Sequence, residues 1–268
     1  ENEMSEKVQP ISIAYPSDGS TPPRLRLTLA PIRLRITAVD QEEWLTGTFT
    51  DPTGNMPLTV QTDGANVRIT SSKNVTAFRR FKAPEFELKI STRKPFALSM
   101  DLGASDQTQV DLGGLPLTEV DIKVGAGQAK FDFSRTNPQE LSAFALKAGA
   151  VELSLLGLGN SNARKIDIDG GAASVTIDFG GRLMRDLDAS IRAGIASTEI
   201  VVPKTTAARV RTKTTLSGVT VGDGFTVKDG AYSTLALLGG QTPVLTVDLQ
   251  AALGSVAITM DDTIALPA

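Results

Sequence analysis

The chain contains no cysteine and no histidine, and this restricts the chemistry open to it. Disulfides, thiolate metal centres, serine–histidine triads and histidine acid–base catalysis are all excluded. The residues whose type and spacing best suit chemistry are the carboxylates Asp111 and Asp132, each of which ends an alternating apolar–polar stretch. In the register argued below they point outward on adjacent turns of the chain, and we expect Ser154 and Asp178 to follow in the same column.

Two stacked carboxylates admit three interpretations. At a strand spacing of about 4.8 Å they could bind a hard cation such as calcium. They could also form an acid pair in which one pKa is raised. The interpretation that we favour is a solvated outer face, with Lys123 and Lys130 as partial neutralisers. We therefore predict no catalytic residue, no cofactor and no metal, with calcium at Asp111 and Asp132 as the alternative.

Arginines alternate with apolar residues early in the chain and should form an outward basic patch. The five are Arg24, Arg26, Arg33, Arg35 and Arg68. Such charges protect an exposed strand edge against pairing with another chain, which is the interpretation we favour. The alternative is a site for an anionic polymer. Nucleic acid is not predicted, because the formal net charge is −3 and aromatic residues make up only 5% of the chain.

The elements that must position these residues are strands, because apolar and polar residues alternate with a period of two. Val120, Ile122 and Val124 form one apolar series, and Ala129 and Phe131 resume it beyond the small residues 125–128. The 41% of hydrophobic residues is enough for a core. Each strand therefore bends at a corner of small residues and keeps its apolar side chains on the inside.

The strand–corner–strand module recurs along the chain. Its corners start at Leu27, Thr62, Leu102, Val124, Leu146, Gly170, Ala193, Thr214 and Ala251. The five steps from Leu102 to Thr214 are 22, 22, 24, 23 and 21 residues. Hairpins reverse after a short loop and would not keep this period, whereas a chain that winds around a core returns to the same place each turn.

The repeat predicts an all-β fold, a β-solenoid of about nine coils, and the alternative is an antiparallel sandwich. In the solenoid Phe131 lies against Val110 and Leu153. Gly and Ala are expected at the corners because successive corners stack tightly. The long steps imply three loop or hairpin excursions outside the coil, at about 37–55, 70–90 and 222–243. Trp44 lies in the first, where we expect it to pack as a lid on the coil.

The ends of the chain differ from its middle. Residues 1–23 are polar and proline-rich and are expected to form an N-terminal arm or linker. The solenoid should span 24–260, followed by a C-terminal tail at 261–268. The sequence has no run of 18 apolar residues, so it predicts no membrane-spanning segment. The first residue is Glu1, which we interpret as a mature end after removal of a leader or as a trimmed terminus.

The stretch from Leu112 to Gly127, LGGLPLTEVDIKVGAG, together with GGAASVTIDF at 170–179, resembles the bacterial toast-rack domains. These belong with cell-wall-active-antibiotic-response proteins and head-GIN adhesin-like domains. The resemblance covers about residues 24–260. It implies a single-stranded right-handed β-helix, placement at the cell surface or envelope, and no enzymatic activity. It supplies no catalytic or ligand residues.

Three functions are carried forward from the sequence. The first is a non-enzymatic, extracellular or envelope-located solenoid that acts as a structural, adhesive or self-assembling module, with another copy or an envelope protein as partner. The second is an envelope-stress regulatory module that binds a membrane protein. The third is a carbohydrate-acting enzyme that uses Asp111 and Asp132.

Overall fold

The computed structural model describes residues 6–16, 22–54, 56–71 and 83–261, and they form an all-β protein, as the alternation predicts. The first strands are β1 (Lys7–Ile13), β2 (Arg24–Leu29), β3 (Arg33–Val39), β4 (Leu45–Asp51), β5 (Leu58–Asp63), β6 (Asn66–Ser71), β7 (Glu85–Ser91) and β8 (Phe96–Asp111). The later strands are β9 (Leu117–Asp132), β10 (Ala143–Leu156), β11 (Lys165–Asp178), β12 (Leu187–Pro203), β13 (Ala207–Val221), β14 (Phe225–Lys228), β15 (Ala231–Thr234) and β16 (Val244–Asp261). Helical structure among the described residues is limited to a 3-10 turn at Leu158–Ser161 and to α1 (Leu235–Leu238).

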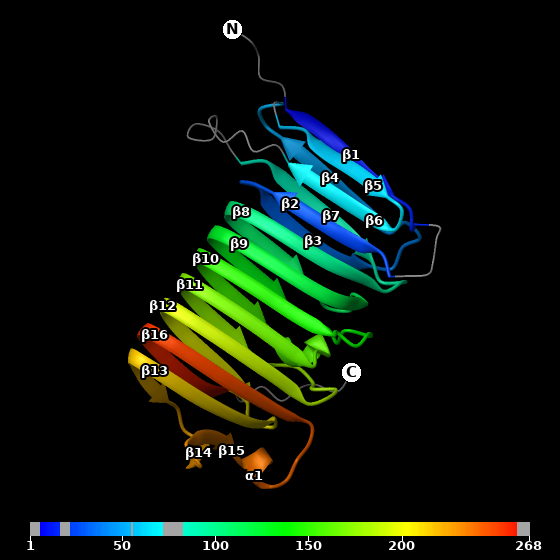
Figure 1. Cartoon of the computed structure of the whole chain (residues 1–268). Coiled ribbons are helices and arrows are strands. Elements are labelled where there is room, and N and C mark those ends of the chain that lie inside the picture. The colour runs from blue at the N-terminus through cyan, green and yellow to red at the C-terminus, as the bar shows by residue number, and fades with distance from the viewer. Residues whose placement is uncertain (1–5, 17–21, 55, 72–82, 262–268) are drawn as a thin grey trace.

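Seven long strands lie side by side and pair in parallel, in the order β8, β9, β10, β11, β12, β16, β13 (Figure 1). The paired residues include Ala97 with Glu119, Glu119 with Ala143, Phe144 with Ile166 and Lys165 with Asp188. These pairs are 22, 24, 22 and 23 residues apart, within the predicted range of 21 to 24, although the corner spacing predicted 22 for β9–β10 and 24 for β10–β11. From β8 to β12 each strand thus lies on the one before it, and side chains one turn apart form columns.

The inward residues of the columns make one continuous apolar core. In β9 the side chains of Val120, Ile122 and Val124 are buried before the corner, and Ala129 and Phe131 are buried after it. The ring of Phe133 meets that of Phe144 edge to face at 6.0 Å between centroids. Burial of this core supplies the main stabilisation, at about 25 cal/mol for each Å² of apolar surface removed from water.

Glycines at the corners stack because the backbones of successive turns approach closely there. A Cβ atom added at Gly125 would lie 2.8 Å from the carbonyl oxygen of Gly103, and one added at Gly149 would overlap the carbonyl oxygen of Gly125. The same contact recurs at Gly194, where a Cβ atom would lie 2.8 Å from the Gly171 oxygen. Any side chain at these three positions would push the turns apart, so close approach requires glycine here.

The structure corrects one detail of the expected register. Phe131 pairs with Val110, as predicted, but its neighbour on the other side is Leu155 and not Leu153. The reason is the offset of 24 residues between β9 and β10, which includes two more residues than a 22-residue turn.

The turns also do not stack strictly in chain order. The last long strand, β16, lies between β12 and β13, with Ile191 paired to Leu249 and Leu249 paired to Thr212. Near the start of the chain, β2 lies between β6 and β8. Both insertions preserve the inward–outward alternation, so the sequence pattern does not oppose them.

The described parts of two expected excursions extend the sheet instead of leaving it, whereas residues 72–82 of the second lie outside the described part of the chain. β4 pairs antiparallel with β1 and with β7, and β7 pairs in parallel with β3. Backbone hydrogen bonding draws these segments into the sheet because an extended strand leaves its polar groups unpaired unless it has neighbours. Part of the expected arm, residues 7–13, forms β1 and lies at this N-terminal end of the stack (Figure 1).

The third excursion is a hairpin at the opposite end of the stack, as predicted. β14 and β15 pair antiparallel, and β15 pairs with β13 at Arg209 and Val210. Together with α1 they lie beyond β13 (Figure 1). Phe225 and Tyr232 from this hairpin pack against the core, so the hairpin covers apolar side chains at the C-terminal end.

Candidate functional site

The sheet brings Asp111 and Asp132 together as direct register neighbours at the ends of β8 and β9. Each carboxylate has its own set of partners. Asp111 accepts hydrogen bonds from the backbone N–H of Gly113 at 2.8 Å and from the hydroxyl of Ser134 at 2.8 Å. Asp132 lies 3.8 Å from the Nζ atom of Lys130. The predicted stacking of the two acids is therefore present, with Asp111 already engaged by donors.

One member of the expected carboxylate column, Ser154, differs from the prediction. Leu156, not Ser154, is the register neighbour of Asp132, and Ser154 pairs with Lys130. The 24-residue offset between β9 and β10 again explains the change. Asp178 accepts hydrogen bonds from the N–H groups of Gly157 at 3.2 Å and Gly180 at 2.8 Å.

The electrostatics of Asp132 favour its protonated form. Burial raises the pKa of the Asp132 carboxyl, and the nearby negative charges of Asp111 and Asp178 raise it further. Lys130 acts in the opposite direction, and the net pKa lies above the ordinary value for aspartic acid. A raised pKa on one of two neighbouring acids is the feature of the acid pair considered from the sequence.

The same acids border a shallow hollow between β3 and the ends of β8 and β9. Its volume is about 240 Å³, and its polar lining consists of Arg35, Thr37, Gln109, Asp111, Lys130 and Asp132. Cations and carboxylates are mixed in this lining. Within the described parts of the chain, no three acidic side chains gather closely enough to hold a metal ion, so calcium binding would depend on Asp111 and Asp132 as a pair.

The expected basic patch is divided between two strands that lie on either side of the corner at 30–32. On β3, Arg33 lies 3.3 Å from Glu85 and Arg35 donates to Gln109 at 3.4 Å. On β2, Arg24 forms an ion pair with Glu119 at 2.6 Å. One patch was expected because all five arginines share the outward alternation, but the corner turns β2 and β3 onto different faces.

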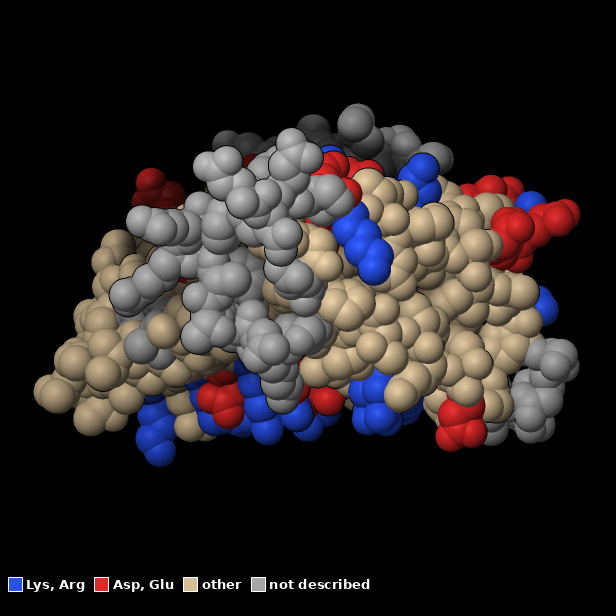
Figure 2. Space-filling view, turned by 90° about the horizontal axis from the view of Figure 1, so that it is seen from above, with Lys and Arg blue, Asp and Glu red and all other residues tan. Residues whose placement is uncertain are grey.

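Arg26 and Arg68 form a distinct group on β2 and β6, which we call the arginine pair. They are direct register neighbours with outward, exposed side chains. A hollow of about 320 Å³ lies over them, lined by Arg24, Arg26, Gln61, Asp63, Asn66, Val67 and Arg68. Viewed down the stack, charged side chains line much of the visible rim of the molecule (Figure 2).

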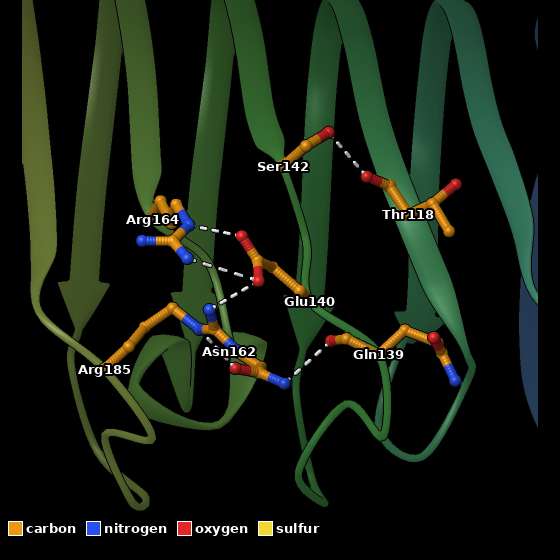
Figure 3. A network of polar contacts seen from close by, with 7 residues as sticks. All are labelled: Thr118, Gln139, Glu140, Ser142, Asn162, Arg164 and Arg185. Carbon is orange, nitrogen blue, oxygen red and sulfur yellow. Dashed lines mark hydrogen bonds and ion pairs between the residues drawn. The ribbon is translucent and has the colours of Figure 1, made fainter.

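A polar network at another corner was not found from the sequence (Figure 3). Arg164 and Arg185, from successive turns, both form ion pairs with Glu140, and Arg185 also donates to Asn162 at 2.8 Å. Asn162 in turn donates to the backbone oxygen of Gln139 at 2.8 Å. The contacts join one turn to the next, so the network is structural. The 23-residue spacing of Gln139, Asn162 and Arg185, within the range of the repeat, was the available signal.

Trp44 is fully buried and serves the packing of the N-terminal end, as expected. Its ring stacks on Tyr15 at 6.0 Å between centroids and meets Phe96 edge to face at 5.8 Å. Lys94 lies over the outer side of the Tyr15 ring at 4.8 Å. The indole is thus enclosed by other rings and is not presented to a ligand.

No helix in the described ranges has the length and apolar character that crossing a membrane requires. Residues 3–144 match the model of a family described as the N-terminal domain of toast_rack. No curated protein matches the chain.

Two solved structures show the general likeness. One is from Clostridium sporogenes and is provisionally named a cell adhesion protein, with 15% identity, a TM-score of 0.45, and coverage of 96% of this chain and 100% of that one. The other is from Bacteroides fragilis and is provisionally named an adhesin, with 9% identity, a TM-score of 0.47, and coverage of 95% and 97%. At these identities and TM-scores, neither structure supports a conclusion about the function of this chain.

Proposed function

The chain belongs to the family of toast_rack N-terminal domains, and on that premise we propose that it is a non-enzymatic module of the cell surface or envelope that acts as a structural or adhesive element. The observation that carries the proposal is the continuous parallel ladder from β8 to β13. Because successive turns are joined along their whole length, the outward side chains form long, stiff polar faces. Such faces suit contact with a large partner better than they suit turnover of a small substrate.

We propose in more detail that the ladder is a single-stranded right-handed β-helix of about nine coils. The offsets of 22 to 24 residues between paired strands support winding of this kind. Residues 24–260 would be the solenoid body, with 1–23 as an arm and 261–268 as a tail. An experimental structure that gave a left-handed path, or a different number of turns, would contradict this assignment.

The proposed location is testable in cells that express the full-length gene. We expect the protein in the envelope or extracellular fraction, and we expect protease added to intact cells to remove it. A cytosolic protein of the same fractionation experiment serves as the control. If this chain is recovered in the same fraction as the cytosolic control and is not cleaved by the added protease, a surface role is contradicted.

The adhesive role can be measured with the purified chain immobilised on beads. Retention of envelope material by these beads, above the level seen with beads that carry the heat-unfolded chain, supports a surface-binding module. If a single membrane protein is retained, and only after treatment of the cells with a cell-wall antibiotic, the regulatory alternative is supported instead.

Self-assembly is a separate part of the proposal. The hairpin β14–β15 covers the C-terminal end but pairs with β13 only at Arg209 and Val210, so the rest of that edge is open among the described strands. Light scattering after size exclusion at rising concentration tests end-to-end association. A mass that grows with concentration supports it, and a constant monomer mass contradicts it.

A carbohydrate-acting enzyme is the second candidate, and the raised pKa of Asp132 beside Asp111 favours it. Glycosidic-bond hydrolysis uses a pair of carboxyl groups, one of which has a raised pKa. Release of reducing ends from cell-wall polysaccharides, abolished in Asp111→Asn and Asp132→Asn but retained in Asp101→Asn, would establish this activity and overturn the non-enzymatic proposal.

A further inference from the structure

The arginine pair places two like charges opposite each other with no acid among their register neighbours. Arg26 and Arg68 are register neighbours on adjacent parallel strands, which lie about 4.8 Å apart. Their other register neighbours are the neutral residues Ser99 and Gln61. No ion pair joins either arginine to another residue in the described ranges, whereas Arg24 beside them is bound to Glu119. Like charges directly opposite each other destabilise a sheet.

Edge protection does not account for the pair. β2 has β6 on one side and β8 on the other, and β6 has β2 and β5. Both arginines therefore lie on interior strands, where there is no open edge to guard. The strand order therefore excludes edge protection as the reason for these two arginines. The repulsion between their charges must be offset in another way.

A second pair of like charges in the same sheet has acidic neighbours that can offset the repulsion. Lys123 and Lys147 are register neighbours on β9 and β10. Their outer register neighbours are Asp101 and Asp169, so each lysine has a carboxylate on its far side. The arginine pair lacks this arrangement, and Asp63 in the lining of the same hollow forms no ion pair with either arginine, so an external anion can supply the compensating charge.

We propose that the arginine pair binds the phosphate group of a phosphorylated polyol. Guanidinium groups donate two parallel hydrogen bonds to phosphate oxygens, and two of them match the charge of a phosphate. The hollow of about 320 Å³ has room for more than the anion.

The remaining polar lining of this hollow identifies the rest of the ligand. Asp63 lies there and only accepts hydrogen bonds when ionised, so it would repel a bare anion but accept from hydroxyl groups. Gln61 and Asn66 can donate to and accept from hydroxyls. A phosphate with neighbouring hydroxyl groups therefore fits this lining better than phosphate alone. This site is independent of the proposed surface function.

The test measures the binding of glycerol 3-phosphate to the full chain by isothermal titration calorimetry at low salt. We expect one site per chain, with affinity that falls as salt rises. Arg26→Gln and Arg68→Gln should each weaken binding at least about tenfold, the effect of a lost hydrogen bond to a charged group. The matched controls Lys123→Gln and Lys147→Gln remove the same charge and should bind as the parent chain does.

A readout other than binding separates this role from misfolding. Without ligand at low salt, Arg26→Gln should have a melting temperature equal to or above that of the parent, because the like-charge contact is relieved. Glycerol 3-phosphate should raise the melting temperature of the parent and not that of the double variant Arg26→Gln/Arg68→Gln.

The source of the phosphate is distinguished by flotation with vesicles of phosphatidylglycerol or of phosphatidylcholine. Flotation with phosphatidylglycerol alone, lost in the double variant, supports the site and assigns it to a lipid headgroup. Binding of soluble glycerol 3-phosphate without flotation supports the site and assigns it to a free or polymeric phosphate. No binding of either by the parent chain, or equal binding by the double variant, overturns the proposal.

Discussion

The side-chain amide of Asn137 hydrogen-bonds to both backbone groups of Leu117, one turn earlier in the stack. Its Nδ2 atom donates to the Leu117 oxygen at 2.9 Å, and its Oδ1 atom accepts from the Leu117 N–H at 3.2 Å. Oδ1 also accepts from the N–H of Gln139 at 3.0 Å. The amide thus replaces a neighbouring strand at a corner where the backbone ladder is interrupted.

Loss of this amide should destabilise the protein. Asn137 is fully buried, so Asn137→Ala leaves both polar groups of Leu117 without their side-chain partner. We expect a loss of about 1–3 kcal/mol in the free energy of unfolding, measured by urea denaturation. Gln128→Ala removes an exposed amide bonded to Glu152 and should cost no more than about 0.5 kcal/mol. Equal losses in the two variants would contradict the role of Asn137.

The glycine corners predict a position-specific effect of one methyl group. In Gly149→Ala the new Cβ atom overlaps the Gly125 oxygen, so the two turns must separate. The expected cost is about 1–3 kcal/mol, as for overpacking elsewhere in proteins. Gly218→Ala is the control, since no heavy atom lies within 4 Å of a Cβ atom there. Thermal unfolding of both variants tests the difference, and a Gly149→Ala protein as stable as the control would exclude close stacking.

Asp51 should contribute stability that depends on pH. Burial by itself would raise the pKa of this carboxyl, but donors from Met56 and Thr53 outweigh it, so the pKa lies below the ordinary value. The Met56 N–H lies 2.5 Å and the Thr53 N–H 2.9 Å from its oxygens. A lowered pKa stabilises the fold above the unfolded value of about 3.9, and this stability is lost as pH falls through the folded pKa.

The measurement is the free energy of unfolding as a function of pH. We expect Asp51→Asn to be less stable than the parent at neutral pH and to lose less stability below pH about 4. The exposed and uncharged residue Gln107 gives the control, and Gln107→Ala should follow the parent curve. Parallel curves for the parent and Asp51→Asn would show that the hydrogen bonds do not favour the charged form.

Asp132 should contribute a pH dependence of stability with the opposite sign to that of Asp51. Its pKa is raised by burial and by the charges of Asp111 and Asp178, against the effect of Lys130. The folded state therefore binds the proton more tightly than the unfolded state, and stability falls as pH rises from the unfolded pKa through the raised folded pKa. Asp132→Asn should lack this fall.

Carboxyl NMR titration checks the cause directly. The Asp132 resonance should titrate above the ordinary aspartate range in the parent chain, and at lower pH in Asp111→Asn, where one of the repelling charges is gone. Asp101→Asn serves as the control, because Asp101 does not contribute to the shift. An Asp132 titration that Asp111→Asn leaves unchanged would show that the two carboxylates do not interact.

Much of the fold could be predicted from local pattern. The alternation of Val120, Ile122 and Val124 identifies the buried side of a strand, because side chains on successive residues point to opposite faces. The stacking of Phe131 on Val110 and of Asp111 on Asp132 follows from the repeat alone. The ion pairs of Arg164 and Arg185 with Glu140, and the hydrogen bonds of Asn162 beside them, were missed because corners carry no period-two signal.

The amino-acid sequence by itself determined which residues face inward, where the chain bends and how many residues make a turn. Only the tertiary structure decided which turn lies beside which. It placed β16 between β12 and β13, and it made the strands of Arg26 and Arg68 interior. The physical reason is that backbone hydrogen bonds are the same for every pair of strands. Alternation is therefore compatible with several neighbours, and the choice among them depends on the packing of the whole stack.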